Sequence, residues 1–118
     1  MYDLIVKGGT VVDPSQNLHG INDVAIEDGK IAKIATDIPA EESKRVVEVK
    51  GKVVTPGLID IHTHVYSGVT DNGVDPDIGG IRAGVTTMVD AGSSGCDTFA
   101  GFPAHIIPNA ATVTTVFL

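Results

Sequence analysis

The chain has 118 residues, of which 42% are hydrophobic and 19% charged, a composition typical of a globular protein and not of a disordered one. Fifteen acidic residues against eight basic ones give a net charge of −7, which argues against nucleic-acid binding and against docking on an anionic membrane. The single cysteine, Cys96, excludes an internal disulfide framework and fits a reducing compartment. Since the N-terminus also lacks a signal-peptide pattern, we expect a cytoplasmic protein without nucleic-acid or membrane partners.

Turn signals divide the first 57 residues into short β-prone runs. Asp28-Gly29 stands between the runs 24–26 and 31–34, and this dipeptide favours a tight hairpin because both positions tolerate positive φ. Gly8-Gly9 predicts a second hairpin, and residues 50–52 predict a third. The polar residues lie largely on turns or alternate with apolar ones. We therefore expect a half-solvated antiparallel sheet with a polar loop over 36–44.

Pro56-Gly57 marks a predicted domain boundary. Residues 1–57 hold nine acidic and seven basic side chains, whereas residues 58–118 hold six acidic side chains and one basic side chain, Arg82. A small free-standing domain is mostly surface and should be richer in charge. The second half therefore indicates the interior of a larger body, although a Gly- and Thr-rich all-β surface is the alternative.

Apolar strands and helical segments alternate after the boundary. Strands are predicted at 58–65, 85–89 and 112–118, a short helix within 73–83, and a helix at 98–107 interrupted by Pro103. This order is typical of parallel βαβ units.

The first of these strands carries two histidines, His62 and His64. Alternation along 58–65 predicts that both imidazoles share one face with Asp60, while the opposite face is mainly apolar. Histidines at i and i+2 lie about 6–7 Å apart at Cα, so their nitrogens can converge on one ion. Imidazole suits Zn, Fe, Ni or Mn, and Asp60 could orient an imidazole. The alternative is two partly exposed histidines on an edge strand.

Two further features of the sequence are the runs Val-Val-Thr-Pro-Gly-Leu-Ile-Asp-Ile-His-Thr-His at 53–64 and Ala-Gly-Val-Thr-Thr-Met-Val-Asp-Ala-Gly at 83–92. The first resembles the start of the barrel in the amidohydrolase superfamily, and the second resembles its second barrel strand. The runs 3–14 and 23–31 resemble the N-terminal strands of the same enzymes. The similarity is greatest to the dihydroorotase, hydantoinase and deacetylase group.

The resemblance implies an N-terminal β-sandwich segment at 1–57, followed at 58–118 by the first βαβαβ part of a (β/α)8 TIM-type barrel. It implies that His62 and His64 are metal ligands, with Zn expected first and Fe, Ni or Mn left open. The implied activity is hydrolysis of a C–N bond in a small amide or cyclic amide through metal-activated water. The family's general base is an Asp of the last barrel strand, its other ligands are two His and often a carboxylated Lys, and we also expect a homo-oligomer.

The sequence departs from this pattern because the later ligands are missing. No lysine follows Lys52, and the remaining downstream histidine, His105, falls on a predicted helix. Three predicted barrel strands are present where a complete barrel has about eight. We expect an N-terminal piece of a longer enzyme, or a chain completed by a partner, inactive alone and with its general base elsewhere. The alternatives are a non-catalytic truncated paralogue or subunit that binds metal weakly or assembles with a partner, and a stand-alone β-sandwich module.

Other polar residues of the second half carry structural expectations. Asp90 ends a strand and is expected in a turn or cap, while Asp75 and Asp77 are expected to be solvated loop acids. Cys96 has no histidine or basic neighbour that would make it a nucleophile. The serines at 93–94, flanked by glycines, resemble a phosphate loop only loosely, because no Gly-Lys-Ser/Thr follows them.

Overall fold

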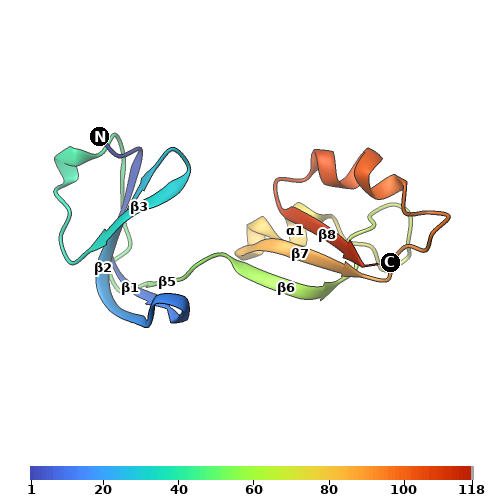
Figure 1. Cartoon of the computed structure of the whole chain (residues 1–118), viewed down its shortest axis with the longest axis horizontal. Helices are drawn as coiled ribbons and strands as arrows, with labels where there is room; N and C mark the ends of the chain where they lie inside the picture. The colour runs from blue at the N-terminus through green and yellow to red at the C-terminus, as the bar shows by residue number, and fades with distance from the viewer. Residues whose placement is uncertain (118) are drawn as a thin grey trace. The chain divides into compact units, whose positions relative to one another are not determined.

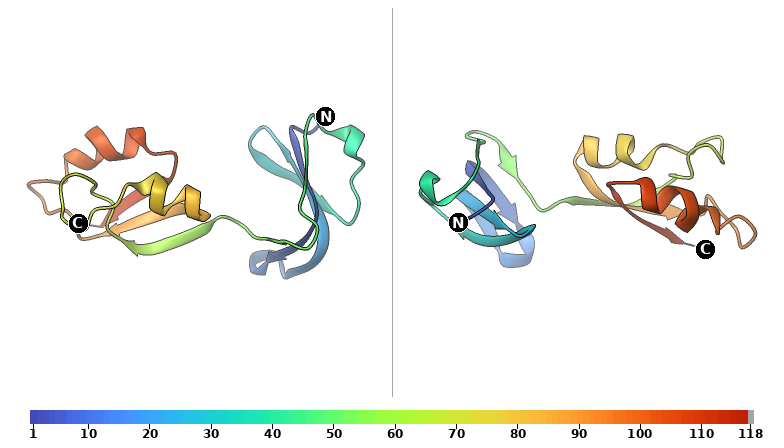
Figure 2. Two further views of the ribbon diagram at one scale, coloured as in Figure 1. Left: turned by 180° about the vertical axis from the view of Figure 1, so that it is seen from behind. Right: turned by 90° about the horizontal axis from the view of Figure 1, so that it is seen from above.

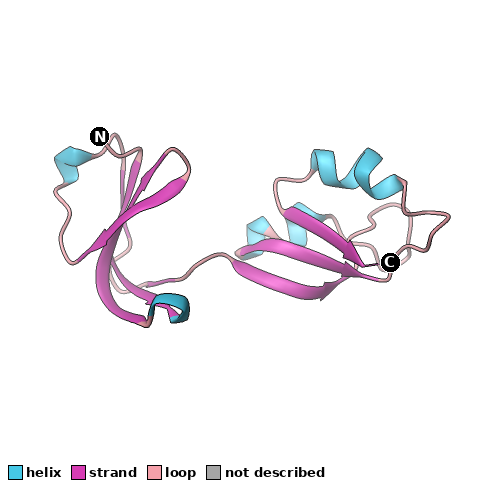
Figure 3. Cartoon of the chain, viewed as in Figure 1, coloured by secondary structure: helices cyan, strands magenta, loops and turns pink. Residues whose placement is uncertain are grey.

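The computed structural model describes residues 1–117, which divide into one compact unit over Met1–Pro56 and a second that begins at Gly57 (Figures 1 and 3). Five strands form the sheet of the first unit, in the order β3-β2-β1-β4 with β5 also paired to β1. Its elements are β1 (Leu4–Asp13), η1 (Pro14–Gln16), β2 (Leu18–Glu27), β3 (Lys30–Ala35), η2 (Ala40–Glu42), β4 (Val46–Glu48) and β5 (Val53–Val54).

The predicted hairpin at Asp28-Gly29 is confirmed. β2 and β3 pair antiparallel up to Glu27 and Lys30, so the two residues between them form the whole turn. Asp28 has φ 51° and Gly29 has φ 72°, the left-handed conformation that a tight hairpin turn requires at both positions.

The predicted hairpin at Gly8-Gly9 is wrong, because β1 continues through both glycines. Gly8 has φ 75°, and the register with β2 shifts between Val6 and Gly9, which is the pattern of a β-bulge. The Gly8 N–H donates a 2.7 Å hydrogen bond to Oδ1 of Asp23. The hydrogen bond to Asp23, 15 residues away in sequence, therefore accompanies a bulge at this positive-φ glycine and not a chain reversal.

The hairpin predicted across 50–52 is also wrong. β4 and β5 do not pair with each other, and each lies parallel to β1, with Val46 opposite Ile5 and Val53 opposite Thr10. Both strands use the same long edge of β1, whose backbone hydrogen bonds would otherwise stay unpaired. The sheet is consequently mixed, and the expectation of a purely antiparallel sheet is corrected.

A buried carboxylate ties the first unit together. The Lys7 ammonium donates to Asp23 at 2.8 Å and to Asp37 at 2.9 Å, and the Ile38 N–H donates to Asp23 at 2.8 Å. Burial acts to raise the pKa of Asp23, but the hydrogen bonds from Lys7, Ile38 and Gly8 outweigh it and hold this pKa below its ordinary value. This network fastens the loop after β3 onto β1. The buried core of the first unit consists of Ile5, Ala25 and Ile38.

The second unit contains a parallel sheet in the order β6-β7-β8, which confirms the predicted alternation of strands and helical segments. Its elements are β6 (Leu58–Thr63), α1 (Pro76–Gly79), η3 (Ile81–Ala83), β7 (Val85–Ala91), the π-helical segment η4 (Phe102–Ile106), η5 (Ile107–Asn109) and β8 (Val113–Phe117). Leu118, the last residue of the predicted third strand, lies outside the described residues. These three strands do not close into a barrel.

The helical segments lie on one side of this sheet, as the two views of Figure 2 show. On that side Val65, Tyr66, Met88 and Phe102 form a buried core, with the rings of Tyr66 and Phe102 stacked 4.1 Å apart. The register places three exposed apolar side chains on the face opposite Met88. They are Ile59 (64% exposed), Val113 (60%) and Phe117 (59%).

Exposed apolar side chains over one sheet face are unusual for a finished domain. Within the described residues of the second unit, nothing covers this face. No helix within residues 1–117 is long and apolar enough to cross a bilayer.

Candidate metal centre

The two predicted ligands lie at the carboxyl end of β6, the end of a strand at which α/β folds place their sites. His62 is exposed near the end of β6, and His64 follows the strand and is half-buried. Their ring centroids are 5.8 Å apart and the ring planes cross at 81°. With metal–nitrogen distances of about 2.1 Å, two imidazoles on one tetrahedral ion have centroids roughly 5–6 Å apart. The spacing therefore suits a shared ion, and the ligand assignment stays a prediction.

The backbone around the histidines is held to the neighbouring strand. The buried Thr63 hydroxyl donates to the carbonyl of Val89 at 3.0 Å, and the Val65 N–H donates to Oδ2 of Asp90 at 2.7 Å. Asp90 is fully buried and also accepts the Ser93 N–H at 2.8 Å. The carboxylate thus fills the turn role expected for it, and it joins the end of β6 to the loop after β7.

The strict alternation predicted for 58–65 is interrupted. Asp60 pairs with Met88 and Thr63 with Asp90, so β6 accommodates one extra residue between these pairs. On the opposite face, which was expected to be mainly apolar, Thr63 and Val65 are buried, whereas Ile59 and Ile61 are exposed. Asp60 accepts the backbone N–H of His62 at 3.1 Å, and the structure shows no contact between its carboxylate and an imidazole.

Ser93 is the residue at this site that sequence reasoning missed. Its hydroxyl lies 2.9 Å from Nδ1 of His64, across 29 residues of sequence. The available signal was its position just after β7, because the carboxyl ends of adjacent parallel strands meet at one edge of a sheet.

The described residues offer no third ligand. Within 1–117 there is no group of three or more His, Cys, Asp or Glu side chains that could hold a metal ion. Cys96 is an exposed free thiol and has no part in the histidine pair. A donor set of two imidazoles falls short of the three protein ligands typical of catalytic zinc sites.

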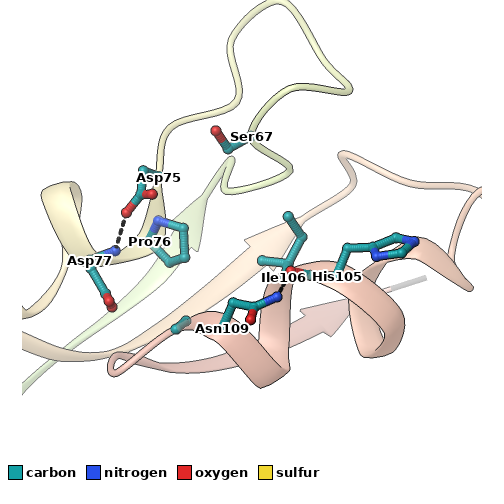
Figure 4. Close-up of a pocket in the computed structure, with 8 residues that line it drawn as sticks. Ser67, Asp75, Pro76, Asp77, His105, Ile106 and Asn109 are labelled. Atoms are coloured by element: carbon teal, nitrogen blue, oxygen red, sulfur yellow. Dashed lines mark hydrogen bonds between the residues drawn. The ribbon is translucent and has the colours of Figure 1, made fainter.

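A separate pocket of about 200 Å³ lies between α1 and the segments η4 and η5 (Figure 4). Its two carboxylates are occupied by backbone groups. Asp75 accepts the N–H groups of Asp77 and Ile78 at the start of α1. Asp77 accepts the N–H groups of residues 111 and 112, which lower its pKa. His105 lies across the pocket from both carboxylates (Figure 4). The structure thus gives both of these expected loop acids a structural role, because Asp75 caps the start of α1 and Asp77 binds the backbone just before β8.

Comparison with known proteins finds relatives that are deacetylases and dihydroorotases. A deacetylase from Agrobacterium fabrum is 41% identical over 80 residues, which are 68% of this chain and 20% of that protein. A dihydroorotase from Aquifex aeolicus is 51% identical over 65 residues, which are 55% of this chain and 15% of that protein. No protein-family model matches the chain.

Solved structures agree with these relatives. A dihydroorotase crystal structure superimposes with a TM-score of 0.86 at 30% identity, covering 100% of this chain and 31% of that one. A D-aminoacylase described with a binuclear metal centre superimposes with a TM-score of 0.62 at 36% identity, covering 76% of this chain and 18% of that one. The chain therefore spans at most a third of the length of these proteins.

Proposed function

The chain belongs to the amidohydrolase superfamily, and from this premise we propose that it carries the first two ligands of a hydrolytic metal centre. The reaction is hydrolysis of a C–N bond in a small amide or cyclic amide. Residues 1–57 are the N-terminal β-sandwich segment, and residues 58–118 are the first βαβαβ part of a (β/α)8 barrel. The observation that carries the proposal is the imidazole pair, 5.8 Å apart at the carboxyl end of β6.

His62 and His64 hold a divalent metal through neutral imidazole nitrogens, with Zn first and Fe, Ni or Mn as alternatives. A divalent ion bound there supplies a water of lowered pKa and polarises the scissile carbonyl. The chain's own contribution is placement. Thr63, between the two histidines, is hydrogen-bonded to β7, and the backbone that follows His64 is fastened to Asp90.

The rest of the barrel supplies the remaining ligands, the general base and the substrate-binding loops, either in the same polypeptide or in a partner chain. The exposed face of the β6-β7-β8 sheet supports this proposal. Barrel interiors are filled mainly by bulky branched side chains, and Ile59 and Val113 on this face are of that kind. A homo-oligomer is part of the same proposal.

A second candidate function is a non-catalytic subunit or truncated paralogue that binds metal weakly. The two-imidazole donor set favours it, because two protein ligands leave an ion weakly held. Hydrolysis by the assembled protein separates the two functions.

The test is metal content together with turnover. We expect His62→Ala/His64→Ala to lose the zinc that the wild type binds at equilibrium, measured by elemental analysis after dialysis. The matched control is His19→Ala/His105→Ala, which removes the two histidines outside the site and keeps the zinc. Equal zinc in the site variant and the wild type would refute the ligand assignment.

Hydrolysis of simple cyclic amides and N-acyl amines is then measured with the chain alone and with its completing partner or segment. We expect turnover only in the assembled protein. Turnover by the 118-residue chain alone, with stoichiometric metal, would refute the need for a further barrel portion.

A further inference from the structure

One ring nitrogen of His64 is already taken. Nδ1 lies 2.9 Å from the hydroxyl oxygen of Ser93, a hydrogen-bonding distance. Imidazole has two nitrogens with different neighbours, and the partner of one decides which is free for another role. Nε2 is therefore the nitrogen of His64 left for an ion.

Ser93 suits this contact in both protonation patterns of a neutral imidazole. A hydroxyl donates to an unprotonated Nδ1 and accepts from a protonated one. When Nε2 binds an ion, the proton resides on Nδ1, and the same oxygen accepts it without moving the ring. A carboxylate could accept a hydrogen bond from Nδ1 but could not donate one to it. A hydroxyl can do both, so it keeps the hydrogen bond when metal binding moves the proton to Nδ1.

Ser93 is itself held by a buried group. Its N–H donates at 2.8 Å to Asp90, whose second oxygen accepts the N–H of Val65, the residue after His64. Asp90 is fully buried, so this bridge is shielded from water. The loop after β7 and the end of β6 are joined at the backbone by Asp90 and at the side chain by Ser93.

We propose that Ser93 is a positioning residue that holds the His64 ring by Nδ1 and directs Nε2 to the metal. The inference rests on the proposed function, because it takes His64 as a ligand. It deepens that function by naming the nitrogen that binds and the residue that selects it. Such supporting contacts are worth about 10- to 100-fold in metal affinity.

The experiment uses Zn²⁺ alone as the probe and the full chain with three substitutions. Ser93→Ala removes the hydroxyl, and Ser93→Thr keeps it. Ser94→Ala is the matched control, since Ser94 is the adjacent buried serine whose hydroxyl has no hydrogen-bond partner within residues 1–117. Affinity is measured by competition with a chromophoric chelator, and the ligating nitrogen by long-range ¹⁵N–¹H spectra of the histidine rings.

We expect the Zn²⁺ dissociation constant to rise about tenfold in Ser93→Ala and to stay near the wild-type value in Ser93→Thr and Ser94→Ala. In the wild type, His64 binds through Nε2 with Nδ1 protonated. In Ser93→Ala we expect His64 to lose this single protonation pattern. The protonation pattern of the His62 ring should not change, so His62 serves as an internal reference.

A wild-type Zn²⁺ affinity together with an unchanged His64 protonation pattern in Ser93→Ala would overturn the proposal for Ser93. The proposed function would still stand if His62→Ala/His64→Ala lost the metal. An equal loss in Ser93→Ala and Ser93→Thr would also overturn it, because position 93 would then act through packing. Undiminished binding by the double histidine variant would instead refute the proposed function.

Discussion

The two units of this chain differ in how their charged and apolar side chains are placed. All four ion pairs of residues 1–117 lie in the first unit, where lysines and the N-terminus meet acidic side chains. The second unit has none in its described residues and instead leaves apolar side chains exposed on one face of its sheet. The first unit pairs many of its charged groups within itself, whereas the second leaves apolar surface exposed on one face of its sheet.

Their cores differ in the same sense. The first core is built from Ile5, Ala25 and Ile38, with a buried carboxylate fastened beside it. The core of the second unit contains a stacked aromatic pair, Tyr66 and Phe102, on the helix-covered side of the sheet. We therefore expect the first unit to be sensitive to charge and pH, and the second to the volume of its aromatic side chains.

The largest expected effect is on the second unit. Phe102 is fully buried, and truncation to alanine should cost about 3–5 kcal/mol through lost burial and the cavity left behind. The two tyrosines lie one in each unit, so the ring signals of Tyr2 and Tyr66 in urea titrations report the units separately. We expect the Tyr66 transition to shift and the Tyr2 transition to stay.

Phe117→Ala is the matched control, because this phenylalanine of the same unit is exposed on the uncovered face. It should change stability by no more than about 0.5 kcal/mol. Equal losses in the two variants would show that the covered face is not the one that stabilises the second unit.

The next largest effect concerns the first unit. Asp23→Ala leaves the N–H groups of Gly8 and Ile38 and the Lys7 ammonium without their shared acceptor. The cost should be about 2–3 kcal/mol, since a buried hydrogen-bonded network loses its centre. The urea transition reported by Tyr2 measures it. Asp37→Ala removes the exposed partner of the same lysine and should have a much smaller effect. The distinction collapses if the two variants unfold at the same urea concentration.

Acid should separate the units further. In the first unit, hydrogen bonds lower the pKa of Asp23 against its burial, hydrogen bonds from Ser15 and Gln16 lower the pKa of Asp13, and the hydrogen bond from Lys44 lowers the pKa of Asp3. A pKa lowered by folding contributes stability that is present above the unfolded value, about 3.9, and is lost as the pH falls through the folded value.

In the second unit, hydrogen bonds from the backbone N–H groups of residues 111 and 112 lower the pKa of Asp77. Lowering the pH from 7 to about 2.5 should therefore weaken the first unit more than the second, as followed by Tyr2 and Tyr66 in urea. The pKa of Lys7 is raised by Asp23 and Asp37, so its contribution is lost only above about pH 10. Equal losses of stability in both units on acidification would contradict the contrast drawn from their charges.

The smallest effect on stability is expected on the uncovered side of the second unit. Ile61 is 71% exposed, so Ile61→Ser should change the unfolding free energy by no more than about 0.5 kcal/mol. The same change should reduce self-association of the chain in sedimentation velocity, because apolar surface is removed. The comparison variant, Ile5→Ser, alters a fully buried residue and should unfold the first unit. A large loss for Ile61→Ser would mean that the exposed side is part of a core.

Local patterns predicted part of the fold well. The Asp28-Gly29 turn and the alternation of strands and helical segments after Gly57 depend on neighbours within a few residues, and both are confirmed. The hairpin predicted at Gly8-Gly9 failed because a positive-φ glycine serves a bulge as readily as a reversal. The hairpin predicted at 50–52 failed because β4 and β5 each pair with β1 and not with each other. The choice at Gly8 depended on Asp23, and the choice at 50–52 on the free edge of β1.

The amino-acid sequence by itself determined the spacing of His62 and His64, because two residues apart on an extended segment is a property of local geometry. Only the tertiary structure decided that Ser93 meets His64 and that Asp90 lies buried beneath the strand end, since these contacts join residues more than twenty positions apart. Sheet register places such residues side by side, and it depends on the pairing of whole strands.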